Sequence, residues 1–177
     1  MFNMRLFYIH YLIFFILYSC GGRSGKTSKN TELTSLKEPL INANKMYIKK
    51  ESDEIDEYVK SHGLEIKITG TGLRYLIYKR SNKNEPAING KYAKVNYKIS
   101  LLNGTPCYSS DELGPKEFLI GHDQVESGLH EGIVFMNVGD KALFILPSHL
   151  AHGLVGDENK IPPRSTVVYD IELLAIK

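Results

Sequence analysis

Six histidines and two cysteines are the residues of this chain best suited to metal binding or nucleophilic chemistry. The spacing His149-x-x-His152 could bring two imidazoles together, but neither this pair nor His122 and His130 supplies a full set of metal ligands. Cys107 has no nearby second cysteine and no cationic cluster that would stabilise a thiolate. We therefore expect no metal, and interpret Cys107 as a small buried residue rather than a redox centre.

The wall of a pocket is predicted near the carboxyl end of the chain. Two runs rich in branched and aromatic residues, Ala142 to Leu146 and Thr166 to Ile176, have the composition of buried strands. The loop between them ends in Ile161-Pro162-Pro163, where the prolines fix φ and hold the approach to the last strand extended. A loop with rigid ends over a sheet is suited to form a pocket wall.

This region resembles the carboxyl half of the FKBP-type peptidyl-prolyl isomerases. The resemblance rests on Gly139-Asp140-Lys141-Ala142, Leu146-Pro147, Ala151-His152-Gly153, Ile161-Pro162-Pro163 and Val168 to Leu174. It extends back through Gly128-Leu129, Gly132 and Met136 to Val95-Asn96-Tyr97, Asn103-Gly104 and Ser109-Ser110. It implies an isomerase domain at 73–177 that acts on proline-containing polypeptides.

Prolyl isomerisation breaks no covalent bond, so a catalyst requires no nucleophile, metal or cofactor. The barrier of about 18 to 20 kcal/mol is the loss of amide resonance in the twisted state. A dry apolar pocket that holds the proline ring, favours the less dipolar twisted amide and offers a donor to a substrate carbonyl would lower it. We therefore expect no cofactor.

The resemblance also implies which residues form the site. It places pocket walls at Tyr97, Val125, Leu129, Ile161 and Tyr169, with Phe118 as a less direct neighbour. The backbone N–H of Glu126 matches the family position that binds a substrate carbonyl, and His152 matches a rim position usually held by a tyrosine. From the sequence pattern alone, ordinary core packing is the alternative for Tyr97, Val125, Leu129 and Tyr169.

Besides His152, three positions depart from the family pattern. Where the family usually reads Phe-Asp-Ser-Ser after the hairpin, this chain reads Cys107-Tyr108-Ser109-Ser110, and the common tryptophan floor is Leu129. Cys107 and Tyr108 are thus expected as altered walls of the pocket. Smaller side chains at Cys107 and Leu129 predict a wider site that still binds proline but fits the ring less closely.

The amino terminus predicts export and lipidation. Residues 1–19 read as a signal peptide, because Leu6 to Tyr18 is an apolar run too short to span a bilayer comfortably. Leu17-Tyr18-Ser19-Cys20-Gly21-Gly22 resembles a bacterial lipobox, so we expect Cys20 to carry lipid. A coincidental cysteine after an ordinary signal peptide or membrane anchor is the alternative. Both place the domain outside the cytoplasm, in the cell envelope facing the periplasm.

Residues 20–45, polar and without period, predict a flexible tether from the membrane. Within 46–72, Ser52 is predicted to cap a helix of about ten residues that Gly63 stops, with Ile55 and Val59 on its apolar face. This helix should dock on its own domain. Together, the lipobox and the family pattern resemble the gliding-motility-associated isomerase lipoproteins of Bacteroidetes.

Alternation and turn signals predict the elements of the domain. Ala93 to Leu101 alternates strictly and Asn103-Gly104 supplies a tight hairpin turn. Further strands are expected at Leu73 to Tyr78 and Phe118 to Ile120, and Asp123 should cap a helix containing Val125, Leu129, Ile133 and Met136. Gly128 and Gly132 in that helix predict close approach to a sheet. The expected fold is α+β, an FKBP-like curved antiparallel sheet wrapped on a short central helix.

Three functions remain open from the sequence. The first is a membrane-tethered prolyl isomerase that assists folding of exported proteins. The second is a binding or chaperone module with a degraded proline pocket, and the third is a structural lipoprotein that uses the helix near Ser52 as a contact. A formal net charge of +2 gives no reason to expect nucleic acid.

Overall fold

The computed structural model describes residues 28–177, with side chains from residue 37 onward. These residues belong to two compact units that divide between Lys45 and Met46. The predicted signal peptide 1–19, the predicted lipid site Cys20 and the first part of the predicted tether lie outside the described residues. None of the helices in 28–177 is long and apolar enough to cross a bilayer.

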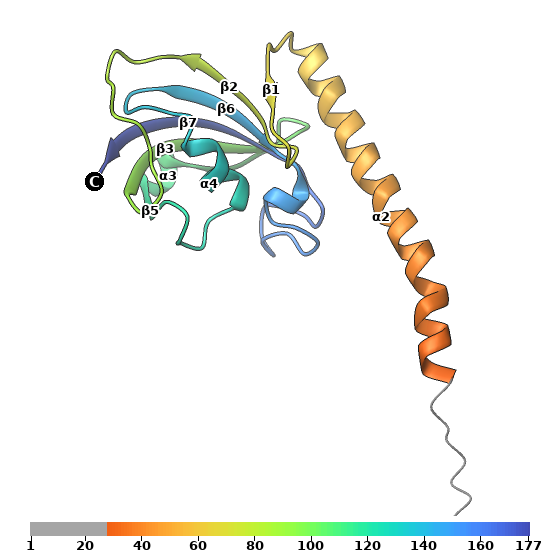
Figure 1. The fold of residues 1–177 in the computed structure, drawn as a ribbon. Coiled ribbons are helices and arrows are strands. Elements are labelled where there is room, and N and C mark those ends of the chain that lie inside the picture. Colours follow the sequence, from red (N-terminus) through yellow and green to blue (C-terminus); the bar gives the residue numbers. More distant parts are fainter. Residues whose placement is uncertain (1–27) are drawn as a thin grey trace, which may run out of the picture. The chain divides into compact units, whose positions relative to one another are not determined.

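The second unit is built on one antiparallel sheet (Figure 1). Its strands are β1 (Lys67–Ile68), β2 (Arg74–Lys79), β3 (Tyr92–Leu101), β4 (Pro106–Ser109), β5 (Lys116–Leu119), β6 (Lys141–Leu146) and β7 (Val167–Ile176). They are ordered β1-β2-β6-β7-β3-β4, and β5 pairs with the first half of β3. The long central pair β3 and β7 is therefore flanked on one side by β6 and on the other by two short strands.

The short helix α4 (Ser127–Ile133) packs on one face of this sheet, whose strands curve around it in Figure 1. A Cβ atom added at Gly128 would lie 2.6 Å from Leu146 Cγ, and one at Gly132 would lie 2.7 Å from Phe144 Cε2. Both glycines are thus required by the close approach of the helix to β6, as predicted. The α+β fold with a curved sheet on a short central helix is confirmed.

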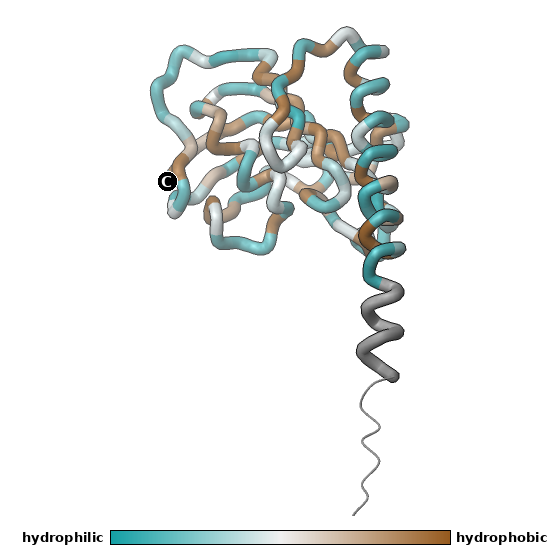
Figure 2. Tube along the Cα trace, turned by 45° about the vertical axis from the view of Figure 1, so that its right-hand side comes forward, coloured by the Kyte–Doolittle hydropathy of each residue, from teal (hydrophilic) through white to brown (hydrophobic). Residues whose placement is uncertain are grey.

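Alternation along β3 fills the core between the sheet and α4. Ala93, Val95, Tyr97 and Ile99 are buried, while the intervening side chains are more exposed. Figure 2 shows the hydrophobic segments along the inner strands and the hydrophilic ones in the outer loops. The predicted turn at Asn103-Gly104 closes the β3–β4 hairpin, where Leu101 N–H donates to Thr105 O at 2.9 Å.

Helix α2 (Ser28–Ser61) begins well before Ser52, the predicted first residue, and part of the predicted tether is therefore helical. The sequence Ser52-Asp53-Glu54 has the local form of a helix start, but the Ser52 hydroxyl instead accepts a hydrogen bond from Arg74 Nη2 at 2.8 Å. The helix ends at Ser61, just before Gly63 with φ +61°. Ile55 is fully buried against Ile145 and Val168, so residues 46–61 dock on their own domain, as predicted.

Glu51 on α2 joins that helix to the loop between β6 and β7. Its carboxylate accepts hydrogen bonds from Ser148 N at 2.7 Å, Ser148 Oγ at 3.1 Å and Thr166 Oγ1 at 2.9 Å. Ser148 opens the short 3₁₀ helix η1 (Ser148–Leu150), and Thr166 directly precedes β7. Both ends of the loop that carries His152 and Ile161 are therefore fixed by one side chain.

The start of α4 differs from the sequence prediction. Asp123 does not cap the helix, whose N-cap residue is Glu126. The Asp123 carboxylate instead accepts a hydrogen bond from Leu119 N at 2.7 Å, which ends β5 in a tight turn. An N-cap and a hydrogen bond to an earlier backbone N–H use the same side-chain oxygen of an aspartate. Val125 therefore precedes the helix, and Met136 also lies outside it because α4 ends at Ile133.

Candidate functional site

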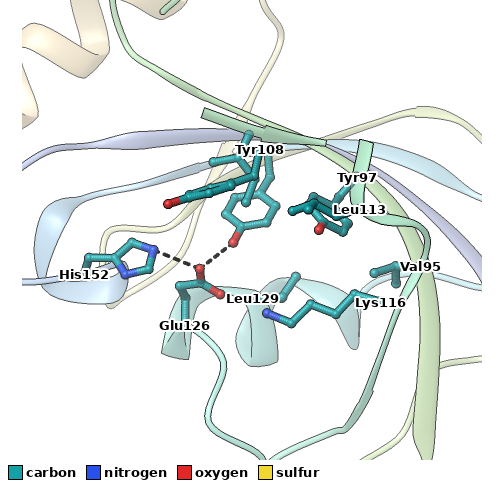
Figure 3. Close-up of a pocket in the computed structure, with 10 residues that line it drawn as sticks. Val95, Tyr97, Tyr108, Leu113, Lys116, Glu126, Leu129 and His152 are labelled. Atoms are coloured by element: carbon teal, nitrogen blue, oxygen red, sulfur yellow. Dashed lines mark hydrogen bonds and ion pairs between the residues drawn. The ribbon is translucent and has the colours of Figure 1, made fainter. Parts of the chain in front are cut away.

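A cavity of about 230 Å³ opens between the concave face of the sheet and α4 (Figure 3). Its walls come from β3, β4, the short helix α3 (Ser110–Leu113), β5, α4, β7 and the loop after η1. The lining residues are Val95, Tyr97, Ile99, Tyr108, Leu113, Lys116, Glu126, Leu129, His152 and Tyr169. Segments far apart in the sequence thus meet around one hollow.

The apolar wall is set by two local features of the sequence. Alternation along β3 places Val95, Tyr97 and Ile99 on the face toward the cavity. Leu129 reaches the same space from the first turn of α4, which lies close to the sheet because of its glycines. The result is a hollow with an aliphatic and aromatic lining, of the kind that holds a small ring away from water.

A polar network stands at one side of this apolar lining. Glu126 Oε1 accepts a hydrogen bond from Tyr169 Oη at 2.6 Å, and His152 Nε2 lies 3.0 Å from the same oxygen (Figure 3). Burial and the neighbouring Glu126 carboxylate together raise the pKa of Tyr169 well above its ordinary value. The phenol is therefore a hydrogen-bond donor across the physiological pH range.

The second carboxylate oxygen of Glu126 is unpaired. The side chain of Glu126 is only 8% exposed, and Oε2 is buried without a hydrogen-bond partner among the described residues. Burying an acceptor without a donor costs about 1 to 3 kcal/mol, and more when the group is charged. The pKa of the Tyr97 phenol is also raised, mainly by burial and to a lesser extent by the negative charge of Glu126. One wall of the cavity therefore offers an unused acceptor.

The backbone N–H of Glu126 is also free. Glu126 O accepts hydrogen bonds from Leu129 N and His130 N, but within residues 28–177 no acceptor pairs with Glu126 N. As the N-cap residue, Glu126 lies before the first turn of α4, where backbone donors have no partner within the helix. The edge of the cavity thus presents a main-chain donor beside a carboxylate.

Tyr108 forms part of the rim and is held there from outside. Its hydroxyl donates a short hydrogen bond to Asp157, and Asn159 Nδ2 donates to the Tyr108 oxygen at 3.2 Å. Asp157 Oδ1 also accepts from Ile161 N at 2.7 Å, so one carboxylate ties Tyr108 to the residue before the proline pair. Burial acts to raise the pKa of Asp157, but these hydrogen bonds outweigh it and the pKa lies below the ordinary value.

Four of the residues expected at the site do not line the cavity. Val125 borders a neighbouring hollow with Glu126 and His152, and Ile161 is buried in the core beneath the double-proline segment. Phe118 is buried and contacts His130 edge to face at 5.7 Å between ring centroids. Cys107 lies opposite no residue of β3, at a register shift in the β3–β4 pair, and its Sγ contacts Lys160 O in the loop between η1 and β7. Cys107 therefore lies outside the lining of this cavity, whereas Tyr108 lines it.

Four lining residues were not expected from the sequence. Val95 and Ile99 share the buried face of β3 with Tyr97, so strict alternation alone could have identified them. Leu113 ends α3 and Lys116 begins β5, two elements too short to show a periodic pattern. The Glu126 carboxylate was also missed, because only its backbone N–H was expected to take part.

The other chemistry-bearing side chains are engaged in local structure. His130 Nδ1 accepts from Gly121 N at 2.9 Å while its Nε2 contacts Asp123 O at 2.9 Å, and His149 Nε2 contacts Thr71 O at 2.9 Å. Cys107 is buried, and desolvation raises the pKa of its thiol. A thiol with a raised pKa is mostly protonated near neutral pH and is a poor nucleophile.

Comparison with known proteins agrees with this geometry. A sequence profile described as FKBP-type peptidyl-prolyl cis-trans isomerase matches residues 83–174. FK506-binding protein 2 of Dictyostelium discoideum is 40% identical over 89 residues, which cover 50% of this chain and 67% of that protein. Peptidyl-prolyl cis-trans isomerase FKBP9 of Homo sapiens is 39% identical over 88 residues, which cover 49% of this chain but only 15% of that protein.

Two solved structures have a similar fold. FkpA from Escherichia coli superposes with a TM-score of 0.62 and 30% identity, over 84% of this chain and 71% of that one. AtFKBP13 gives a TM-score of 0.60 and 29% identity, over 64% of this chain and 99% of that one. The residues matched by the sequence profile, 83–174, include β3 to β6, α4 and every residue that lines the cavity.

Proposed function

Since the chain belongs to the FKBP-type peptidyl-prolyl cis-trans isomerase family, we propose that it catalyses cis-trans isomerisation of X-Pro bonds in polypeptides. The observation that carries this proposal is the apolar cavity with an unoccupied main-chain donor, Glu126 N–H, at its edge. Neither a nucleophile nor a cofactor is needed, because the reaction is a rotation about one amide bond.

The cavity wall supplies the first requirement of catalysis. A proline ring held over Leu129, between Val95 and Tyr97, exchanges contact with water for apolar contact. The planar amide is more dipolar than the twisted one, so an environment with few polar groups disfavours the ground state more than the transition state. Every tenfold acceleration requires about 1.4 kcal/mol of such preference.

The free donor supplies the second requirement. A hydrogen bond from Glu126 N–H to a substrate carbonyl would fix the peptide relative to the cavity. Because a main-chain donor is held in place by α4, it is already oriented before substrate arrives. His152 and Tyr169 keep the Glu126 side chain on one side, which leaves the N–H facing the cavity edge.

The test is an exchange measurement on an X-Pro tetrapeptide. With the purified domain present, NMR exchange cross-peaks between the cis and trans forms should appear at mixing times far shorter than the uncatalysed tens to hundreds of seconds. Folded protein that leaves the exchange rate equal to that in buffer would remove the enzymatic function.

A tryptophan at the floor of the cavity sharpens this test. The chain contains no tryptophan, so Leu129→Trp introduces a single indole, which can be excited apart from the tyrosines, and a larger surface for the proline ring. We expect higher kcat/KM and a fluorescence change when a prolyl peptide is added. Val155→Trp is the matched control, because Val155 is 69% exposed in a loop and lines none of the cavity. Equal fluorescence responses from both variants would place peptide binding elsewhere.

A second function, binding of prolyl segments with little turnover, is favoured by one observation. The carboxylate of Glu126 stands inside the cavity, and a charge there stabilises the dipolar planar amide as well as the twisted one. Suppression of aggregation of an unfolded protein, together with peptide binding but no faster exchange, would support this alternative.

We further propose that the protein works in the bacterial cell envelope, anchored through lipidated Cys20 and assisting folding of exported proteins. Support comes from the lipobox-like sequence Leu17 to Gly22 and from the resemblance to gliding-motility-associated isomerase lipoproteins of Bacteroidetes. Full-length chain expressed with an alkyne-labelled fatty acid should carry the label in the membrane fraction, and Cys20→Ala should not. Label retained in Cys20→Ala, or absent from both, would contradict the anchor.

A further inference from the structure

The cavity contains a polar feature that holding a proline ring does not use. Glu126 Oε1 is engaged by Tyr169 and His152, whereas Oε2 is buried without a donor among the described residues. The side chain rises from the start of α4 toward Tyr108 and His152, beside Leu129 on the cavity floor (Figure 3). A buried carboxylate with one idle oxygen is poorly matched to a purely apolar ligand.

No described side chain around the cavity donates a hydrogen bond to Glu126 Oε2. Lys116 also lines the cavity, but its ammonium makes no ion pair with Glu126, nor with any other described acid. Lys160 lies over the Tyr108 ring, 5.2 Å from its centroid, and near Glu112. The remaining lining groups near Glu126 are apolar or phenolic, and none of them donates to Oε2, which leaves this oxygen open to a donor on the ligand.

We propose that Glu126 selects prolyl peptides that carry a positively charged side chain, Lys or Arg, next to the proline. This inference rests on the proposed function, because it assumes that the proline ring occupies the cavity. Hydrogen bonds between charged partners are roughly twice as strong as neutral ones, and a partly dehydrated site strengthens them further. A cation therefore satisfies Oε2 better than a neutral donor does.

The position of Glu126 explains why the charge should be adjacent to the proline. Its own N–H is the donor assigned to the substrate carbonyl, so its carboxylate lies within one residue of the bound ring. The side chain before the proline and the side chain after it can both reach this point. An ion pair with Glu126 has the same chemistry whether the cation precedes or follows the proline, and the experiment below distinguishes the two positions.

The experiment measures dissociation constants rather than turnover, so it does not depend on how fast the protein isomerises. Four tetrapeptides are titrated by NMR into the wild-type domain. Two have lysine or its neutral isostere norleucine before the proline, and two have the same pair after it. We expect the lysine peptide of one pair to bind about tenfold more tightly than its norleucine partner, as for one charge-assisted hydrogen bond.

Glu126→Gln tests the assignment to this residue. Glutamine keeps the shape and an acceptor for Tyr169 but removes the charge, so the ratio should fall to about twofold or less. Glu131→Gln is the matched control, because Glu131 lies on the same helix and pairs with Thr71 at 2.7 Å outside the cavity. It removes the same charge from the domain and should leave the tenfold ratio in place.

The outcomes separate this inference from the proposed function. If the wild type binds none of the four peptides, both this inference and the proposed function fail. If it binds lysine and norleucine peptides equally, charge selection fails while the isomerase function stands. A lysine preference that survives in Glu126→Gln, or that Glu131→Gln abolishes, would overturn the role of Glu126.

Discussion

Two glutamates in this domain lie almost out of reach of water, and they are held in opposite ways. Glu51, 5% exposed, receives three hydrogen bonds from Ser148 and Thr166, which occupy both carboxylate oxygens. Glu126, with a side chain 8% exposed, has both its contacts on one oxygen and none on the other. The first lies between α2 and the domain, and the second lies in a cavity.

This difference in hydrogen bonding indicates that Glu51 has a structural role and that Glu126 is a candidate for ligand binding. A buried charge is tolerated when its hydrogen bonds are complete, and removing its partners is then costly. A buried charge with an idle oxygen contributes less to the fold than it could, and such groups gather where proteins bind ligands. The comparison predicts that mutation of Glu51 acts on stability, while mutation of Glu126 itself acts on ligand binding in the cavity.

The largest expected effect is at Glu51. Replacing it with alanine leaves the Ser148 N–H and the Ser148 and Thr166 hydroxyls buried without an acceptor, and should lower the free energy of unfolding by about 3 kcal/mol or more. Urea denaturation followed by circular dichroism measures this. Glu57→Ala, at an exposed position of the same helix, should change the free energy by less than about 0.5 kcal/mol. Similar losses in both variants would mean that helix propensity, not the buried carboxylate, sets the result.

The next effect is at Tyr169, the strongest partner of Glu126. Tyr169→Phe removes the 2.6 Å hydrogen bond to Oε1 and leaves the carboxylate with His152 alone, so stability should fall by about 2 kcal/mol. Tyr78→Phe is the control, because the Tyr78 hydroxyl makes an equally short bond to Asp170 but the residue is 49% exposed. Its loss should be below about 1 kcal/mol. Equal losses in the free energy of unfolding for the two variants would show that burial of the phenol does not determine the effect.

A smaller loss of stability is expected at Asp157, whose carboxylate accepts hydrogen bonds from Ile161 N and from the hydroxyl of Tyr108 on the cavity rim. Because the pKa of Asp157 is lowered in the folded state, its contribution is complete above the unfolded pKa and is lost as the pH falls through the folded value. Asp157→Asn should cost about 1 kcal/mol at pH 7 and should flatten the decline in stability below pH 4. Urea midpoints from pH 2 to 7 test this, and an unchanged acid slope would contradict it.

The smallest effect is at alkaline pH. Because the pKa of Tyr169 is raised well above its ordinary value, the unfolded chain ionises this phenol first as the pH rises. The advantage of the wild type over Tyr169→Phe should therefore be constant below about pH 10 and should shrink above it. Thermal denaturation of both proteins at pH 7 to 11 measures this difference in stability. A difference that grows as the pH rises would contradict the prediction.

Much of the fold could be predicted from local patterns. Alternation from Ala93 to Leu101 identified β3, Asn103-Gly104 identified its hairpin, and two glycines predicted the contact of α4 with the sheet. The starts of two helices could not be predicted. Ser52 and Asp123 have the residue types of an N-cap, but their side chains bond to Arg74 and Leu119 instead. A cap and a tertiary contact compete for the same oxygen, and only the fold decides between them.

The site was predictable only in part, because tertiary contacts that the sequence pattern does not show also determine it. Tyr97, Leu129, His152 and Tyr169 were expected at the cavity from the family resemblance, and the structure brings them together with Tyr108. The carboxylate network was not expected, because Glu126, His152 and Tyr169 are far apart in the sequence. Cys107 lies at a register shift that has no sequence signal of its own. Tertiary contacts and strand register, rather than periodicity, determine these features.

The most direct test of the central claim follows the amide of Glu126 during peptide binding. In a ¹⁵N-labelled domain titrated with an X-Pro tetrapeptide, the Glu126 N–H signal should move among the most strongly, and cis–trans exchange of the peptide should accelerate in the same samples. Accelerated exchange with an unmoved Glu126 amide, or an unmoved amide and unchanged exchange at saturating peptide, would contradict the account.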